Sequence, residues 1–281
     1  MDPNLLLGGL VIDSERKREF CFKPLTGLIE RKIQDSSEKY KSLPDQISEV
    51  LARTLKTVAG LPVNREVVES LCTGDRQYLM LKLHELVNPA PEWITCNCVS
   101  CNERIQFLMD FRQLPVKEAG TNYPRTDISY KDISYSLRVP TGNDETLLAE
   151  NNREKKLSWT SVLKHLLSTG DDFSIDNLEQ DEISKLDSML DDMTPQIASS
   201  VQVSCPYCET DQHVFIDHYG WLGEVKEIDR EVHELASHYH WSEQEILSLS
   251  RNRRKRYLAM INRSSGRYSN ARPGVDPGGV M

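Results

Sequence analysis

The chain has 281 residues, of which 38% are hydrophobic and 27% charged, and its formal net charge is −9. This length and balance predict a globular intracellular protein of one or two domains, and the acidity argues against nucleic acid as the main partner. No apolar run approaches the ~18 residues of a membrane-spanning helix, and the start MDPNLLLGGLVI lacks the basic segment of a secretory signal.

Seven cysteines, an odd number, favour a reducing cytoplasm over a disulfide framework. Two of them, Cys21 and Cys72, stand alone among apolar neighbours and are predicted to be small core residues.

Residues 1–90 are predicted to form a short extended start followed by helices. Apolar residues alternate in REFCFKPLTG, and a helix is predicted from Leu28. A second helix is predicted over DQISEVLARTLKTVAGL, because its apolar residues fall on one helical face: Ile47, Val50, Leu51, Leu55 and Val58. Gly74 is expected to break the next helical run, and Asp75 to cap the helix that follows.

Two CxxC pairs, Cys98/Cys101 and Cys205/Cys208, are the most specific motif of the chain. Two residues between cysteines let both sulfurs of one turn face one ion, so two such turns supply the four thiolates of a structural zinc site. Two alternatives stay open. The cysteines could be buried or incidental thiols, or Cys96 could replace Cys98 or Cys101 as a ligand.

Each cysteine pair precedes a similar apolar run, which predicts two knuckle-plus-strand halves of one zinc ribbon over residues 91–114 and 199–223. The separation of the two pairs requires an inserted subdomain, residues 115–198. The insertion is predicted to contain a strand in YKDISYSLRVPTGND that ends at a Pro140/Gly142 turn. Two helical patterns follow, in SWTSVLKHLLSTG and IDNLEQDEISKLDSMLDDM, with an acidic, solvated face.

Residues 224–262 are predicted to form two amphipathic helices, one over 224–240 and one over 242–262. Ser242 and Glu245 form a capping-box pattern at the start of the second helix. The tail over 263–281 is rich in Gly, Pro, Ser and Arg and is predicted to be disordered.

The first of these helices contains His233, Glu234 and His238, which imitate the HExxH motif of zinc proteases. The spacing is one residue too long, so the two imidazoles leave the common helical face that the motif requires. A metallohydrolase also needs an open metal position, which four thiolates close. The sequence therefore predicts no catalytic residues.

The second helix carries a basic cluster that is predicted to bind a partner: Arg251, Arg253, Arg254, Lys255, Arg256 and the adjacent Tyr257. A basic helix surface suits either nucleic acid or an acidic protein surface. In a chain with net charge −9, a protein partner is the preferred interpretation.

Several segments, in this order along the chain, resemble the T-even-type bacteriophage base-plate proteins, a family also found in phage-tail-like contractile injection systems. They are FKPLTGLIERKI, LCTGDRQYLMLKL, the first cysteine hairpin, LRVPTGND, VSCPYC and EVHELASHYHWSEQEILSLSRNRRKRYL. The extra Cys96 and the Gly-rich tail depart from the family's pattern. The resemblance implies a structural or assembly role at the base plate or central hub of a contractile tail, without catalysis.

The fold class predicted from these patterns is α+β, mostly helical, with a split zinc-ribbon-like β element formed by the two CxxC knuckles. The predicted cofactor is one structural Zn²⁺, held by Cys98, Cys101, Cys205 and Cys208. We expect other base-plate or hub proteins as partners, and no membrane or small-molecule substrate. The expected location is the cytoplasm of a bacterial cell during assembly, and then the particle. The alternative function is a zinc-ribbon adaptor that binds nucleic acid or a polymerase.

Overall fold

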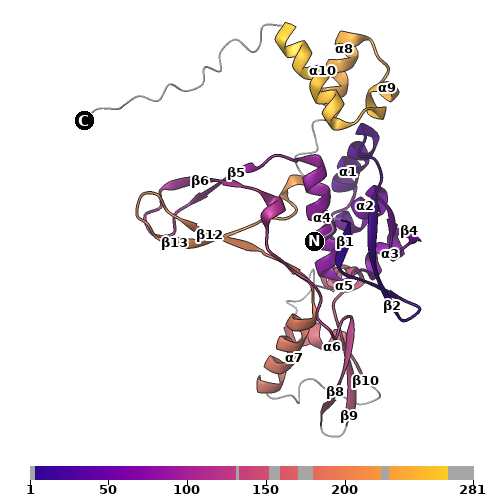
Figure 1. Cartoon of the computed structure of the whole chain (residues 1–281), viewed down its shortest axis with the longest axis vertical. Helices are drawn as coiled ribbons and strands as arrows, with labels where there is room; N and C mark the ends of the chain where they lie inside the picture. The colour runs from indigo at the N-terminus through magenta and orange to yellow at the C-terminus, as the bar shows by residue number, and fades with distance from the viewer. Residues whose placement is uncertain (1–3, 131–132, 152–158, 170–179, 223–227, 265–281) are drawn as a thin grey trace.

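The computed structural model describes residues 4–130, 133–151, 159–169, 180–222 and 228–264. A central body carries three projections: an arm of two β-hairpins, an inserted subdomain and a group of C-terminal helices (Figure 1). Helices make up 48% of the described residues. The α+β class is confirmed, but the chain is less helical than predicted, because several segments read as helical or irregular form strands.

The body combines a four-stranded antiparallel sheet with four helices. The sheet order is β1-β2-β3-β4, with β1 Leu5–Ile12, β2 Glu15–Phe22, β3 Leu55–Val58 and β4 Leu61–Pro62. The helices are α1 Gly27–Lys39, α2 Leu43–Thr54, α3 Arg65–Ser70 and α4 Thr73–Val87. Asp13 and Ser14 join β1 to β2, both with positive φ, which is the geometry of a tight hairpin turn. β1 was not predicted.

The helix predicted through Val58 ends earlier. It stops at Thr54, and residues 55–58 become β3, which pairs with β2. Leu55 and Val58 are fully buried all the same. Both residues would be buried on the apolar side of a helix or of a strand. The pairing with β2 therefore determines that this segment is a strand.

Gly74 and Asp75 do not break and cap a helix as predicted. Gly74 lies inside α4, where a Cβ atom would come within 1.9 Å of the carbonyl oxygen of Pro195. Asp75 is fully buried, and its carboxylate accepts hydrogen bonds from the amides of Gly8 and Gly9 at 2.7 and 2.6 Å. It therefore fastens α4 to the edge of β1. Cys72 is buried as predicted, whereas Cys21 is exposed, so the prediction for Cys21 is wrong.

The arm consists of two separate antiparallel hairpins. The first pairs β5 Glu92–Asn97 with β6 Arg104–Met109, and the second pairs β12 Ser200–Ser204 with β13 Asp211–Phe215. At the base of the arm, apolar side chains of β6, of the short helix η1 (Phe111–Gln113) and of the segment that follows β13 join the core of the body: Met109, Phe111, Ile216, Trp221 and Leu222. The cysteine knuckles lie at the opposite, free end (Figure 1).

The insertion begins and ends side by side, because β7 Val116–Lys117 pairs with β11 Gln196–Ile197. Beyond this neck lies a three-stranded sheet of order β10-β9-β8, with β8 Arg125–Tyr130, β9 Ile133–Arg138 and β10 Leu167–Thr169. Its helices are α5 Gly142–Asn151, α6 Trp159–Leu166 and α7 Gln180–Met193. The predicted strand corresponds to β9, and the preceding β8 was not predicted. The sheet, α6 and α7 enclose a second core around Leu137, Leu163 and Met193, whereas α5 packs against α2, α3 and α4 of the body.

The C-terminal helices are α8 Ile228–Tyr239, α9 Glu243–Ser248 and α10 Arg251–Ser264. The predicted capping box at Ser242 is present. The single helix predicted after it is instead broken at Leu249, which is extended and accepts a hydrogen bond from the amide of Gly27 at 3.1 Å. The tail beyond residue 264 lies outside the described residues. No helix in the described part is long and apolar enough to cross a membrane.

Candidate metal centre

The four cysteines of the two CxxC pairs converge at the free end of the arm. The Sγ atoms of Cys98 and Cys208 are 3.6 Å apart, those of Cys101 and Cys205 are 3.7 Å apart, and all four lie within 4.8 Å of one another. A disulfide needs about 2.05 Å, so none is formed. Four sulfurs placed about 2.3 Å from one Zn²⁺ in a tetrahedron are separated by about 3.8 Å. The cluster therefore fits a tetrahedral thiolate site.

The two knuckles are built alike, although more than 100 residues separate them. In each, the amide of the first cysteine donates to the carbonyl oxygen five residues later: Cys98 to Glu103 at 2.9 Å, and Cys205 to Thr210 at 3.0 Å. The residue after the second cysteine has positive φ in both, 60° at Asn102 and 59° at Glu209. This repeated backbone geometry turns both sulfurs of each pair toward the same point.

Each knuckle contributes one buried and one exposed cysteine. Cys98 and Cys205 are buried, and Cys101 and Cys208 are exposed. Hydrogen bonds from the hydroxyl and amide of Thr210 lower the pKa of Cys208 to about 6. The pKa of Cys101 rises to about 12, because the lowering effect of the Glu103 amide is outweighed by burial and the neighbouring sulfurs. Without a cation, the four sulfurs cannot all be ionised near neutral pH, because their negative charges would repel one another.

Cys96 lies outside the sulfur cluster. Its Sγ accepts a hydrogen bond from Nε2 of Gln212 at 3.5 Å, and the same nitrogen donates to the carbonyl oxygen of Asn97 at 3.4 Å. Oε1 of Gln212 accepts from the amide of Val99 at 2.8 Å. Gln212 thus links β13 of one hairpin to the knuckle of the other. The sequence offers no signal for this role, since a glutamine after the second knuckle reads as a surface residue.

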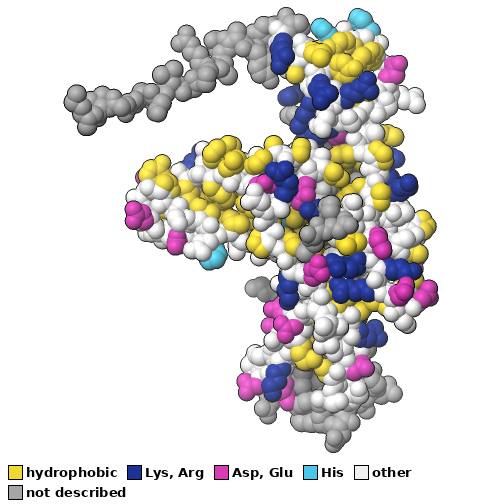
Figure 2. Space-filling model, viewed as in Figure 1, with side chains coloured by type: hydrophobic (Ala, Val, Ile, Leu, Met, Phe, Trp, Pro, Cys, Tyr) yellow, Lys and Arg dark blue, Asp and Glu magenta, His cyan; other side chains and the backbone are white. Residues whose placement is uncertain are grey.

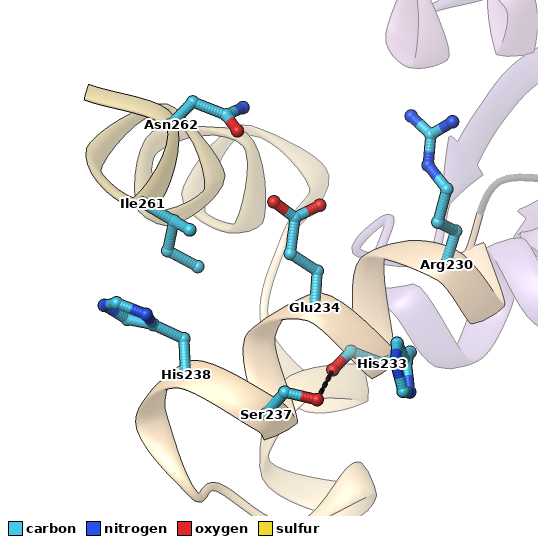
Figure 3. A pocket seen from close by; sticks show the side chains of 7 residues that line it. All are labelled: Arg230, His233, Glu234, Ser237, His238, Ile261 and Asn262. Carbon is cyan, nitrogen blue, oxygen red and sulfur yellow. Dashed lines mark hydrogen bonds between the residues drawn. The ribbon is translucent and has the colours of Figure 1, made fainter. Parts of the chain in front are cut away.

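His233, Glu234 and His238, which imitate the HExxH motif, line a pocket of about 690 Å³ between α8 and α10, shown in Figure 3. The imidazoles of His233 and His238 lie at opposite ends of the pocket, and Glu234 points toward α10. Within the described residues, the four cysteines are the one group of three or more potential ligands close enough to hold a metal. The histidines therefore do not assemble a second metal centre here.

The basic cluster of α10 is divided between two faces. Arg254 is fully buried and donates to Glu231 and Glu30, at 2.8 Å in each case. Nη1 of Arg251 lies 3.7 Å from the same Glu30 carboxylate. Three members are exposed, Arg253, Lys255 and Arg256, and Tyr257 is partly buried. The buried position of Arg254 rules out the predicted contact with a partner, because this guanidinium is used inside the chain.

The buried contacts of Arg254 join the C-terminal helices to the body. Arg31 of α1 adds to this junction by pairing with Asp229 of α8 and Glu243 of α9. A Cβ atom at Gly27 would come within 2.9 Å of Arg254, so the helices approach the start of α1 closely. The acidic partners of Arg254 lie far away in the sequence, and no local pattern predicted them.

Residues 13–219 match a family model described as T4 bacteriophage base plate protein. The matched range contains most of the body, the insertion and both hairpins of the arm with all four clustered cysteines. It ends before α8. No match was found among the curated proteins or among the solved structures.

Proposed function

Because this chain belongs to the family of T4 bacteriophage base plate proteins, we propose that it is a non-enzymatic structural or assembly protein of the base plate or central hub. The particle is a contractile phage tail or a phage-tail-like injection system. Its partners are other base-plate or hub proteins, which it meets in the cytoplasm of the bacterial cell during assembly and then in the particle. The protein acts by contact, without a small-molecule substrate.

In this proposal one Zn²⁺, bound by Cys98, Cys101, Cys205 and Cys208, fixes the free end of the arm. The convergence of four sulfurs from two distant hairpins is the observation that supports it most directly. Thiolates are soft ligands that suit zinc, and a closed four-sulfur site is typical of structural rather than catalytic zinc. The ion fastens two two-stranded hairpins that would be marginal alone. A rigid arm then presents the same surface to every partner.

The second part of the proposal concerns docking through α10. Arg253, Lys255 and Arg256 are exposed on this helix, whereas Arg254 is buried in its ion pairs with Glu231 and Glu30. Exposed cations on a chain with net charge −9 are suited to an acidic protein surface. The contact would steer assembly and set the orientation of the chain.

The metal proposal is tested by elemental analysis of protein purified without chelator. We expect one zinc per chain. Cys205→Ser should lose the metal and unfold the arm locally, because structural zinc sites contribute on the order of 10 kcal/mol in small zinc domains. Cys21→Ser is the matched control, since Cys21 is an exposed thiol outside the cluster. Wild-type protein without metal, or a Cys205→Ser variant with full metal content, would contradict the proposal.

The structural role is tested in assembling cells. A chain with Cys205→Ser should fail to enter base-plate intermediates or particles, and the Cys21→Ser control should enter them normally. Mass spectrometry of the purified particles measures incorporation. Particles that form and function normally without this chain would contradict a structural or assembly role.

The exposed cations of α10 also support a second candidate function, in which the chain is an adaptor that binds nucleic acid or a polymerase. This function predicts binding to duplex DNA or RNA that weakens steeply with salt and is lost in Arg253→Glu with Arg256→Glu. Incorporation into base-plate intermediates without detectable nucleic-acid binding would favour the structural role.

A further inference from the structure

The arm carries the most exposed large apolar side chains of the described residues, and two of them lie at its free end. Among the described residues, the four most exposed large apolar side chains all lie on the arm: Val99 76%, Phe215 74%, Trp93 68% and Tyr207 67%. Val99 and Tyr207 belong to the two knuckles, one to each. We use the name arm tip for residues 99–104 and 206–211. Trp93 and Phe215 lie near the base of the arm, so Val99 and Tyr207 are the exposed apolar side chains of the arm tip. Exposed apolar side chains of this kind mark a contact surface.

The arm tip is also acidic. Its exposed carboxylates are Glu103, Glu209 and Asp211, and Arg104 is the one cation in the two segments. Figure 2 shows apolar and acidic side chains together at the end of the arm. A partner for this surface must therefore combine cations with apolar side chains.

The outer face of α10 has this complementary chemistry. Arg253, Arg256, Met260 and Arg263 follow one another at intervals of three and four residues, so they share one side of the helix, and all four are exposed. Met260 is 56% exposed. The helix contains 14 residues and no carboxylate. We call Arg253, Arg256, Met260 and Arg263 the basic face of α10. Lys and Arg side chains are visible over the C-terminal helices in Figure 2.

We propose that the arm tip of one molecule docks on the basic face of α10 in a second copy of the chain. Three carboxylates then meet three cations, and Val99 and Tyr207 meet Met260. The proposal rests on the proposed metal centre, because the two knuckles form one tip only while they are held together. It names a second copy as the acidic partner of α10.

The two surfaces cannot meet within one molecule in this structure. The arm and the C-terminal helices leave the body in different directions, and the arm tip lies far from α10 (Figure 1). The contact is therefore between copies. Because it joins two different patches, a single contact leaves one free tip and one free basic face. Copies therefore associate either by two reciprocal contacts in a two-fold dimer or by head-to-tail addition into a larger ring or a chain.

Sedimentation velocity of the zinc-loaded full chain tests the proposal. We expect concentration-dependent dimers or larger species at about 0.05 M salt, and their dissociation at about 0.5 M, because screening shortens the range of charge attraction. Arg253→Glu with Arg256→Glu should weaken association about tenfold or more, as should Glu103→Lys with Glu209→Lys. Lys56→Glu with Lys185→Glu is the control for the α10 variant, since it makes the same change in net charge at exposed residues of the body and the insertion.

A mixture of the two variants provides the sharpest test. In the α10 variant, both the arm tip and the outer face of α10 are acidic. In the tip variant, both surfaces are basic, so neither variant should associate with itself. In the mixture, the reversed tip faces the reversed α10, and the unchanged tip faces the unchanged α10. Association should therefore return only on mixing. Both variants should keep one zinc per chain and the wild-type melting temperature.

Three results would overturn the proposal. One is a wild-type chain that carries zinc and remains monomeric at low salt and high concentration. Another is association that both variants leave unchanged. The third is failure of the mixture to associate. A monomeric, zinc-loaded chain whose α10 variant still fails to enter particles would assign the basic face to a different base-plate protein and leave the proposed function standing. Absence of zinc would instead contradict the proposed function itself.

Discussion

The side-chain oxygen of Gln212 accepts a hydrogen bond from the amide of Val99 at 2.8 Å, across the space between the two hairpins of the arm. Val99 lies inside the first CxxC knuckle, and Gln212 follows the second. The contact holds the two knuckles in register beside the sulfur cluster. It gives the arm a second link between the hairpins besides the cysteine cluster.

Replacement of Gln212 by alanine should weaken metal binding without removing a ligand. Loss of a group that orients metal ligands typically costs about 10–100-fold in affinity. The rate of zinc transfer to a chromogenic chelator measures this effect. Gln202→Ala is the matched control, because Gln202 is exposed on the paired strand β12. Equal transfer rates for the two variants would remove Gln212 from this role.

Arg254→Ala should destabilise the junction between the C-terminal helices and the body. The change leaves Glu30, which is 3% exposed, without its closest cationic partner. Breaking a buried ion pair by removing one partner costs about 3–5 kcal/mol. Thermal or urea unfolding measures the loss. The neighbouring exposed Arg253→Ala should change stability by less than about 0.5 kcal/mol.

Asp144 should stabilise the insertion at neutral pH, and this contribution should be lost at acid pH. Burial alone would raise its pKa, but Arg138, together with hydrogen bonds from Thr141, holds it below the usual value. A carboxyl whose pKa is lower in the folded state contributes stability above its unfolded pKa of about 3.9, and this is lost as pH falls through the folded pKa. Asp144→Asn should therefore destabilise the chain by about 1–3 kcal/mol at neutral pH and flatten the acid limb of the stability curve.

The control for this experiment is Asp187→Asn, which changes an exposed carboxylate on α7. It should leave both the stability at neutral pH and the acid limb close to those of the wild-type chain. If the free energy of unfolding falls equally with decreasing pH in the wild type and in Asp144→Asn, the assigned role of the Arg138–Asp144 pair is contradicted.

Gly74→Ala should disrupt the contact between α4 and the neck of the insertion. The added Cβ atom would meet the carbonyl oxygen of Pro195 at 1.9 Å, which no side-chain rotation relieves. Overpacking of this kind costs about 1–3 kcal/mol, even though alanine favours a helix. Gly60→Asn is the control, because a Cβ atom there meets nothing within 4 Å and asparagine tolerates the positive φ of 78°. A stabilised Gly74→Ala chain would contradict the close packing.

Local patterns determined those features that depend on few neighbours. The helical periodicity of the insertion predicted α7 with Leu186 and Leu190 buried, and the Ser242 capping box predicted the start of α9. The two CxxC pairs predicted the cysteine cluster, because a short turn between two ligands is itself a local structure. The ordered family segments predicted membership in the base-plate family, which the match over residues 13–219 confirms.

Other features depend on residues that are distant in the sequence, and only the tertiary structure shows them. At these positions long-range pairing outweighs the local preference of the sequence. Leu55 and Val58 suit a helix and a strand alike, and pairing with β2 makes them a strand. Arg254 reads as one of a row of surface cations, yet Glu30, 224 residues away, draws it into the interior. Asp75 reads as a helix cap, but two glycine amides of β1 bind its carboxylate. In each case the deciding partner lies far away in the sequence, where neither periodicity nor spacing could indicate it.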